Sequence, residues 1–237
     1  MHLDKLRDFV SQSSYIVFFG GAGVSTESGI PDFRSTDGLY NEEWEYPPEV
    51  MISSSFFSSQ PKDFYDFYRA KLLHLDAEPN NAHRALAVLE KTGKLRAVIT
   101  QNIDGLHQKA GSKAVIELHG SVWRNFCQDC NSHYEVNTIA NAPDVPICNC
   151  GGIIKPDIVL YEDFLDEENM IAAMDHIAQA DMLIIGGTSL GVYPAAGLLH
   201  AYRGERLVLI NKTETHMDDV ANLIIRDNIG DALSCFI

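Results

Sequence analysis

The chain has 237 residues, of which 46% are hydrophobic and 22% charged, a composition typical of a soluble globular protein. Its formal net charge of −15 argues against direct nucleic-acid binding, which calls for a basic surface. No apolar stretch reaches the roughly 18–20 residues that span a bilayer, and the N-terminal residues lack the basic-then-apolar order of a signal peptide. We therefore expect a cytoplasmic protein, favoured to be a monomer, with neither a membrane nor a nucleic-acid partner.

Six short apolar runs are predicted to be strands of a parallel sheet. Each is a mainly apolar run without regular alternation, which is typical of a strand covered on both faces. They comprise residues 15–19, 95–99, 114–118, 157–161, 182–185 and 206–210. Helical patterns lie between several of them, at residues 81–91, 166–179 and 194–203. This alternation predicts an α/β fold with a Rossmann-like, doubly wound parallel sheet.

Two stretches interrupt the alternation. Residues 35–79 are rich in aromatic side chains, and residues 120–156 hold four of the five cysteines. We expect both to leave the sheet and return, and together to form a smaller domain with a helical module and a zinc ribbon. The remaining residues, 1–34, 80–119 and 157–237, would then form the nucleotide-binding domain.

A glycine loop at residues 21–23 follows the first predicted strand, as in loops that approach a pyrophosphate closely. The ordinary dinucleotide fingerprint is incomplete, because Thr26 stands where a third glycine is usual. Phe33 would shield a reacting sugar carbon from water, and Arg34 would pair with phosphate. The segment therefore predicts a loop that contacts sugar as well as phosphate.

Polar residues also follow four of the other predicted strands. They stand at the presumed carboxyl ends, where open α/β sheets bind ligands. These groups are Gln101 to Asp104, His119 and Gly120, Gly187 to Ser189, and Asn211 and Lys212. Their common placement predicts one binding site along one edge of the sheet.

The segments GAGVSTESGIPDFR, TQNIDGLH, ELHGS and GTSLGVYPAA, with the cysteine quartet, occur in the order and at the spacing seen in sirtuins. The chain resembles these Sir2-related, NAD-dependent protein lysine deacylases from about Tyr15 to its end, and most closely the compact bacterial members. The resemblance implies a deacetylase that consumes NAD and yields nicotinamide and O-acetyl-ADP-ribose.

The resemblance also implies residue roles. His119 would be the general base on the ribose hydroxyls, a role that suits an imidazole at neutral pH. Asn102 would hold a ribose hydroxyl or water, and Asp104 would bind the nicotinamide carboxamide. The residues expected to line the cofactor are Ala22, Ser25, Thr26, Phe33, Arg34, Gln101, Asn102, Ile103, Asp104, His119, Gly187, Thr188, Ser189, Asn211 and Ile229.

Two further segments, KPDIVLYED and GVYPAA, resemble those between which family substrates insert as an extra strand. Val159, Leu160 and Val192 would line the acyl-lysine tunnel, and acetylated proteins bound in an extended conformation would be the partners. The family more often has Phe-Gly-Glu at residues 161–163, where this chain has Tyr-Glu-Asp. Acids at this rim would favour basic residues beside the acyl-lysine.

Acyl preference is predicted from the helical insertion. Family members that remove succinyl or malonyl groups carry Tyr-x-x-Arg there, whereas this chain has Tyr65-x-x-Tyr68. Without a positioned guanidinium, a buried acyl carboxylate would be unpaired. The sequence therefore predicts neutral acyl groups, acetyl first.

Four cysteines have the spacing of a metal site. Cys127 and Cys130 are followed, after a gap of 17 residues, by Cys148 and Cys150. Such pairs form a tetrahedral thiolate zinc site, although the second pair is one residue tighter than the usual Cys-x-x-Cys. A redox pair beside a thioredoxin-like unit is the alternative. We expect one structural zinc, since four thiolates leave no position for water.

Two other functions use the same features. An ADP-ribosyltransferase would use the same cofactor pocket, but Asn102, Asp104 and His119 together favour deacylation, because a pure transferase has less need of a base for acyl migration. A non-catalytic module would instead dock a partner through the cysteine lobe, and its effect would not depend on His119.

Overall fold

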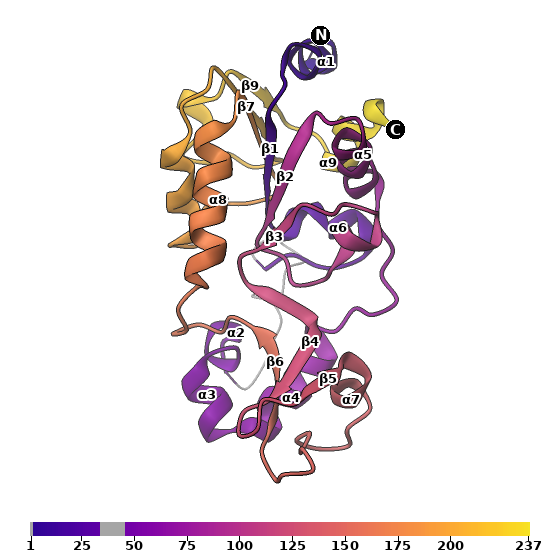
Figure 1. The fold of residues 1–237 in the computed structure, drawn as a ribbon, viewed down its shortest axis with the longest axis vertical. Coiled ribbons are helices and arrows are strands. Elements are labelled where there is room, and N and C mark those ends of the chain that lie inside the picture. The colour runs from indigo at the N-terminus through magenta and orange to yellow at the C-terminus, as the bar shows by residue number, and fades with distance from the viewer. Residues whose placement is uncertain (1, 34–45) are drawn as a thin grey trace.

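The computed structural model describes residues 2–33 and 46–237, so Arg34 lies outside the described residues. Its larger lobe contains a six-stranded sheet, at the top of Figure 1, in which every pairing is parallel. The spatial order β3-β2-β1-β7-β8-β9 corresponds to the order 3-2-1-4-5-6 of a Rossmann sheet, which confirms the predicted fold class. The strands are β1 (Ile16–Gly20), β2 (Leu95–Thr100), β3 (Val115–Glu117), β7 (Met182–Gly186), β8 (Arg206–Ile210) and β9 (Leu223–Ile225).

Helices cover both faces of this sheet, with α8 and α5 on opposite sides of it in Figure 1. Ile16 and Phe18 of β1 pack in the cluster that holds α1, α5 and α9, whereas Val17 and Phe19 pack with α8 and η4. Because successive strand residues point to opposite faces, β1 is buried along its whole length. The helices are α1 (His2–Gln12), α5 (Asn81–Lys91), α6 (Leu106–Lys109), α8 (Glu167–Gln179) and α9 (Ile229–Leu233), with 3₁₀ helices η1 (Ala22–Val24), η2 (Thr26–Ser28), η4 (Ala195–Ala201), η5 (Asp218–Val220) and η6 (Ser234–Phe236).

Side-chain caps explain where two of these helices begin. The Asn80 side chain accepts a hydrogen bond from the Ala82 N–H at 2.9 Å, and the Asn80 N–H donates to His83 Nδ1 at 3.3 Å. The Asp166 carboxylate accepts from the Asn169 N–H at 2.7 Å. Each cap satisfies N–H groups that have no partner within the first helical turn. Helix α5 therefore begins at the predicted residue, Asn81, and α8 begins at Glu167, one residue after the predicted start.

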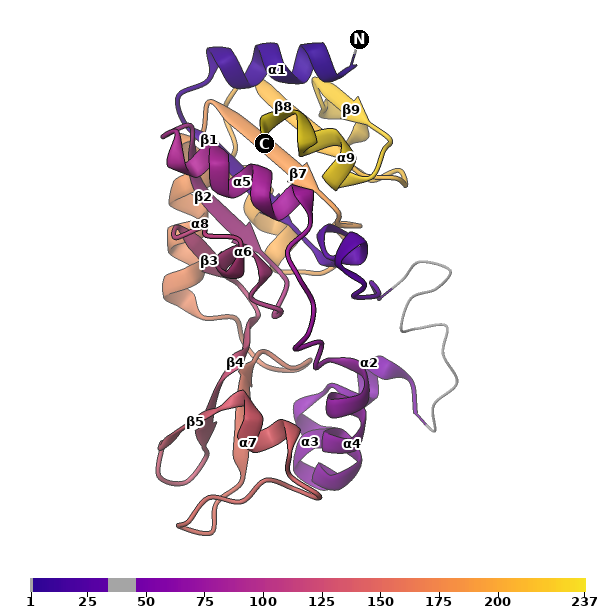
Figure 2. The same cartoon turned by 90° about the vertical axis from the view of Figure 1, so that its right-hand side faces the viewer.

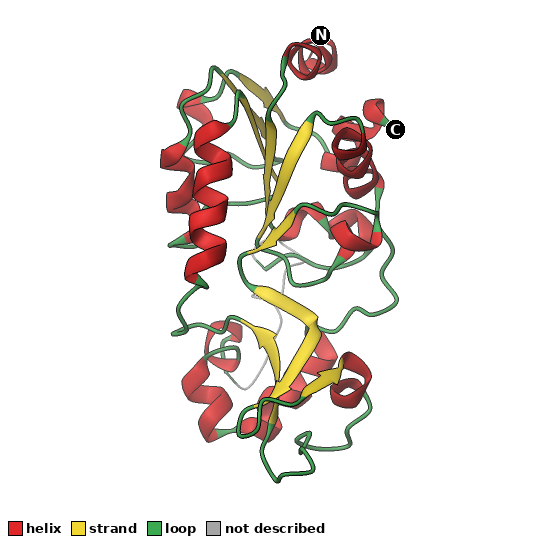
Figure 3. Ribbon diagram, viewed as in Figure 1, coloured by secondary structure: helices red, strands yellow, loops and turns green. Residues whose placement is uncertain are grey.

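The smaller lobe combines a three-stranded antiparallel sheet, of order β5-β4-β6, with short helices, as the lower half of Figure 3 shows. One hydrophobic cluster joins the two insertions, since it contains Phe64 and Tyr68 from the first and Val122 and Ile139 from the second. Figure 2 shows α3 and α4 beside α7 and β4 in this lobe. The elements are α2 (Pro48–Met51), α3 (Ser54–Ser59), α4 (Pro61–Lys71), β4 (Gly120–Cys127), β5 (His133–Glu135), α7 (Val136–Ala140) and β6 (Ile154–Ile158).

The strand predicted at residues 157–161 is wrong as a member of the parallel sheet. The observed strand, β6, ends at Ile158 and pairs antiparallel with β4 in the small lobe. Its residues alternate between buried and half-buried positions, and Ile158 and Leu160 pack into the small-lobe cluster. The apolar run therefore reflects burial in a different core.

Two shorter elements also differ from expectation. Strand β9, with three residues, completes the edge of the sheet and was not predicted, because so short a run carries no distinguishable pattern. The segment after Pro194 forms the 3₁₀ helix η4 rather than an α-helix, and Pro194 stands at its N-cap. Neither difference changes the strand order of the predicted fold.

We propose two domains much as the sequence suggested, with one boundary moved. The expected boundary at residues 156/157 falls inside β6, which pairs throughout with β4. A boundary after Ile158 keeps the three-stranded sheet whole. Among the helices of residues 2–33 and 46–237, none is long and apolar enough to cross a bilayer.

Candidate active site

A cleft of about 890 Å³ lies at the carboxyl ends of the parallel strands and reaches the small lobe. It brings together residues that are far apart in sequence, including every predicted cofactor and substrate residue that the structure describes. Those residues are Ala22, Ser25, Thr26, Phe33, Gln101, Asn102, Ile103, Asp104, His119, Val159, Leu160, Gly187, Thr188, Ser189, Val192, Asn211 and Ile229. Their functional roles remain predictions.

The glycine loop after β1 contacts the loop after β7 directly. The Gly23 N–H donates to the Gly187 carbonyl oxygen at 2.8 Å. Gly187 has a φ of +58°, and a Cβ there would lie 2.4 Å from the Val24 nitrogen, so no side chain fits. Strands β1 and β7 are the neighbours at which the strand order reverses, the point where open α/β sheets bind ligands. The sequence thus permits the close backbone approach that a nucleotide crevice requires.

A short hydrogen-bonded chain fixes the carboxylate of Asp104. The Asn102 side-chain amide donates to Ser25 Oγ at 3.1 Å, and Ser25 Oγ donates to Asp104 Oδ2 at 2.6 Å. The other carboxylate oxygen accepts from the Leu106 N–H at 2.9 Å. Ser25 is only 1% exposed, so it has little freedom to leave this chain. The three polar residues therefore present a defined set of donors and acceptors to the cleft.

His119 is held in one tautomer. Its Nδ1 lies 2.8 Å from the carbonyl oxygen of Gln101. A carbonyl oxygen only accepts, so Nδ1 carries the proton and Nε2 keeps its lone pair. Burial lowers the pKa of His119, and the hydrogen bond to Gln101 offsets part of this effect. The imidazole is therefore neutral at pH 7 and able to accept a proton.

Further contacts connect the other predicted cofactor residues. The Gln101 side-chain amide donates to Thr188 Oγ1 at 3.2 Å, which joins the loops after β2 and β7. The Asn211 side chain donates to the Thr213 carbonyl oxygen at 2.9 Å. Beside Ile229, the Glu27 carboxylate accepts from the Gly230 N–H at 2.7 Å. The residues predicted from five strand ends thus lie on one surface.

Other cleft residues were not predicted. Asp227 and Asn228 follow β9, whose short length concealed the strand end that places them. Lys71, Leu72 and His74 come from the end of α4 and the loop after it. No local pattern marks this second group, because only the packing of the insertion against the sheet brings it to the cleft.

The predicted substrate segment runs along the junction of the lobes. The Val159 N–H donates to the His119 carbonyl oxygen at 3.0 Å, directly beside the predicted base. Leu160 is 3% exposed, and Val192 approaches the same cleft from the loop after β7. A segment so close to His119 is well placed to present a peptide to it.

The tyrosines used to predict acyl preference do not line the cleft. Tyr65 and Tyr68 are fully buried in the small-lobe cluster, and Tyr65 Oη donates to the Ile154 carbonyl oxygen at 2.5 Å. Burial raises the pKa of both hydroxyls. Both aromatic side chains belong to the core of the small lobe. The preference for neutral acyl groups stays a prediction.

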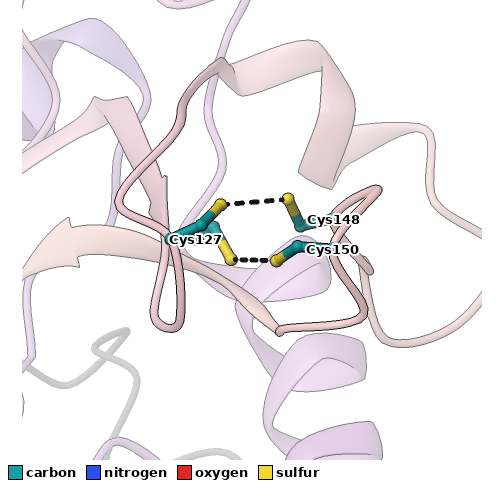
Figure 4. Close-up of side chains that lie close together, drawn as sticks. Cys127, Cys148 and Cys150 are labelled. Carbon is teal, nitrogen blue, oxygen red and sulfur yellow. Dashed lines mark hydrogen bonds between the residues drawn. The ribbon is translucent and has the colours of Figure 1, made fainter.

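The four cysteines converge into one site, and Cys127, Cys148 and Cys150 point toward one another in Figure 4. All four sulfur atoms lie within 4.8 Å of one another. Two separations, Cys127–Cys150 at 3.4 Å and Cys130–Cys148 at 3.6 Å, approach the roughly 3.8 Å expected between ligands of a tetrahedral zinc–thiolate site. The cluster fits one zinc ion, and the tight second pair does not prevent the four sulfurs from meeting.

The strand order reverses between β1 and β7, and the glycine crevice lies at that point. Together with the inserted cysteine lobe, this arrangement defines a dinucleotide-binding α/β protein with a metal-binding lobe. Residues 21–194 match the model of the Sir2 family, and the chain belongs to this family. An NAD-dependent protein deacetylase of Clostridium perfringens is 57% identical over 235 residues, covering 98% of this chain and 96% of the relative.

Solved structures agree with this assignment. A Sir2 protein with a deacetylated p53 peptide and 3'-O-acetyl-ADP-ribose has a TM-score of 0.90 and 39% identity, covering 98% of this chain and 96% of that one. A Sir2 complex with a p53 peptide and NAD+ has a TM-score of 0.87 at the same 39% identity, with coverage of 98% and 96%. The similarity extends over both lobes.

Proposed function

We propose that this chain is an NAD-dependent protein lysine deacetylase that yields deacetylated lysine, nicotinamide and O-acetyl-ADP-ribose. Relatives with this activity in their names match nearly the whole chain. The single observation that carries the proposal is the neutral His119, held by Gln101 with Nε2 available, in a cleft lined by both lobes.

The cleft residues suit NAD as the co-substrate. When bound, NAD supplies the ribose carbon from which nicotinamide departs and the ADP-ribose that receives the acetyl group. The loops containing Ala22, Thr26, Thr188 and Ser189 would hold its phosphates and sugars at the close approach of β1 and β7. Asp104, fixed by Ser25, offers its carboxylate to an amide N–H.

His119 would act as the general base. Its Nε2 accepts a proton from a hydroxyl only in the neutral form, and burial favours that form. Asn102 lines the same cleft, where its amide donates to Ser25 and offers polar contact without charge. His119 would thus accept the proton, and Asn102 would orient a hydroxyl or a water molecule.

An acetylated protein segment would bind in an extended conformation between residues 159–163 and the loop containing Val192. Backbone pairing of this kind gives affinity with little demand on peptide sequence. Related Sir2 proteins have been solved with p53 peptides, which supports peptide binding at this type of site. We further propose a cytoplasmic monomer that does not bind nucleic acid directly, in keeping with its acidic charge.

The zinc ion would be structural. Cys127, Cys130, Cys148 and Cys150 supply four thiolates, which fill a tetrahedral shell. These residues lie in the small lobe and are not among the residues that line the cleft. The metal would accordingly support the lobe and take no part in proton transfer.

The function is tested by incubating the protein with an acetyl-lysine peptide, with and without NAD labelled in its ADP-ribose half. Nicotinamide release should require the peptide, and the label should appear in O-acetyl-ADP-ribose. His119→Ala should abolish the formation of O-acetyl-ADP-ribose, whereas His200→Ala, at an exposed surface position, should retain it. Label attached to protein would instead indicate ADP-ribosyl transfer and would overturn the proposal.

A further inference from the structure

Glu162 adopts a backbone conformation that disfavours its residue type. Its φ is +78°, in the left-handed region that glycine enters readily and other residues seldom do. It lies between Tyr161 and Asp163, and all three line the cleft. A glutamate kept in such a conformation must be held by its surroundings.

The Glu162 carboxylate is turned toward the small lobe. Oε2 accepts a hydrogen bond from the Ser55 N–H at 2.9 Å, and Oε1 accepts from Ser55 Oγ at 2.9 Å. Ser55 stands in the first turn of α3, so both carboxylate oxygens are joined to one end of this helix. A carboxylate engaged in this way has less capacity to attract a charge on a passing peptide.

The neighbouring backbone is tied to the start of the same helix and to the residues that lead into it. The Tyr161 N–H donates to the Ile52 carbonyl oxygen at 3.0 Å, and the Ser54 N–H donates to the Tyr161 carbonyl oxygen at 3.0 Å. These bonds make a short parallel bridge between Ser53 and Tyr161. The segment is therefore anchored to the small lobe by its main chain on one side of Glu162.

Asp163 anchors the other side. One of its oxygens accepts from the Leu160 N–H at 3.1 Å and the other from Ser54 Oγ, while Lys155 Nζ lies 3.8 Å away. Lys155 also donates to the Ile158 carbonyl oxygen at 3.1 Å. The turn at residues 160–163 is thus closed onto α3 by two consecutive carboxylates.

We propose that Glu162 is a positioning residue for the acyl-lysine peptide: it fixes residues 159–163 onto α3 and so presets the edge along which the peptide pairs. This proposal rests on the proposed function and is an alternative to the expectation that acids at this rim favour basic peptides by their charge. Its effect is to reduce the ordering that the edge must undergo when a peptide adds to it.

Two substitutions at Glu162 separate positioning from charge. Glu162→Gly removes both side-chain bonds while tolerating the positive φ, so the fold is retained. Glu162→Gln removes the same charge but keeps an oxygen to accept from the Ser55 N–H and an amide to donate to Ser55 Oγ. Glu167→Gln, at an exposed position on α8 outside the cleft lining, controls for net charge.

The test measures the Kd of labelled acetyl-lysine peptides with basic or acidic flanks by fluorescence anisotropy, together with the KM of each peptide and of NAD. We expect Glu162→Gly to weaken both peptides alike, by about three- to tenfold, with the KM of NAD unchanged. Glu162→Gln and Glu167→Gln should remain within about twofold of the parent chain on the same scale.

An equal loss of affinity for the basic peptide alone in Glu162→Gln and Glu162→Gly would show that the peptide is recognised by the charge of Glu162. That result would overturn the proposal. Unchanged peptide affinity in Glu162→Gly would overturn it as well. Because Kd is measured without turnover, a parent chain that binds peptide but releases no nicotinamide would contradict the proposed deacetylase activity alone. The pattern of Kd values would still decide the role of Glu162.

Discussion

Trp123 donates its indole N–H to the backbone carbonyl oxygen of Asp104, at 2.8 Å. The same ring packs so closely on Gly105 that a Cβ there would lie 2.6 Å from the indole nitrogen. Trp123 belongs to β4, the strand that enters the cysteine lobe, whereas Asp104 lines the cleft. The small lobe is thus joined by a side chain to the turn that carries a predicted catalytic residue.

Trp123→Phe should loosen this turn. The substitution keeps most of the aromatic packing but loses the hydrogen bond, so we expect the KM of NAD to rise by about three- to fivefold and nicotinamide to inhibit less well. The KM of the peptide should not change. Steady-state kinetics with each substrate varied in turn would test this, and an increase confined to the peptide KM would contradict it.

Activity should depend on the neutral form of His119. The folded-state pKa lies below the usual 6.5, because burial disfavours the imidazolium. Nε2 therefore remains a base above that pKa, and kcat/KM should fall about tenfold per pH unit only below it. A pH profile from about pH 5 to 8 should show an acidic midpoint under 6.5, whereas a midpoint above that value would oppose the assignment.

Acid should also destabilise the fold through His83 and His107. Burial lowers the pKa of His83 to about 4 and the pKa of His107 well below its usual value, and their rings lie 4.7 Å apart. Below about pH 6.5 these histidines bind protons in the unfolded chain but stay neutral in the folded chain. The free energy of unfolding should therefore decrease by up to about 1.4 kcal/mol per pH unit for each histidine.

Urea titrations at several pH values would measure this slope. His83→Gln should reduce it, whereas the exposed control His200→Gln should leave it unchanged. Stability that stays constant on acidification would show that neither buried histidine resists protonation. The two histidine predictions are independent, since one concerns turnover and the other concerns unfolding.

Removal of zinc should unfold the small lobe first. Cys148→Ser breaks the thiolate cluster, and a loss of about 3 kcal/mol would lower Tm by roughly 6–12 °C. Metal analysis should find one zinc per parent chain and little in the variant. Cys235→Ser is the matched control, because Cys235 is outside the cluster and contacts the Ala232 carbonyl oxygen. Retention of zinc by Cys148→Ser would contradict the assigned ligand set.

The sequence predicted the site better than the small lobe. Residues such as Asn102 and Thr188 follow strands buried on both faces, and the carboxyl ends of parallel strands necessarily share one edge. Their convergence therefore follows from fold class alone. The cysteines were equally predictable, since a tetrahedral metal constrains spacing directly.

Residues whose position depends on contact between distant segments were not predictable. The partner of Glu162 is Ser55, more than a hundred residues away and in an insertion without repeating pattern. The burial of Tyr65 and Tyr68 was equally unpredictable, because it depends on strands that follow much later. An apolar run likewise could not show whether residues 157–161 joined the larger or the smaller sheet.

The shared core of the small lobe has a consequence for synthesis on the ribosome. Phe64 and Phe67 emerge long before Val122 and Ile154, the strand residues that later help to cover them. During that interval the nascent chain exposes aromatic side chains, because the strands that cover them have not yet been synthesised. We expect chaperones that bind emerging polypeptides to bind this chain. All four cysteines can bind a metal ion together only after Cys150 has left the exit tunnel.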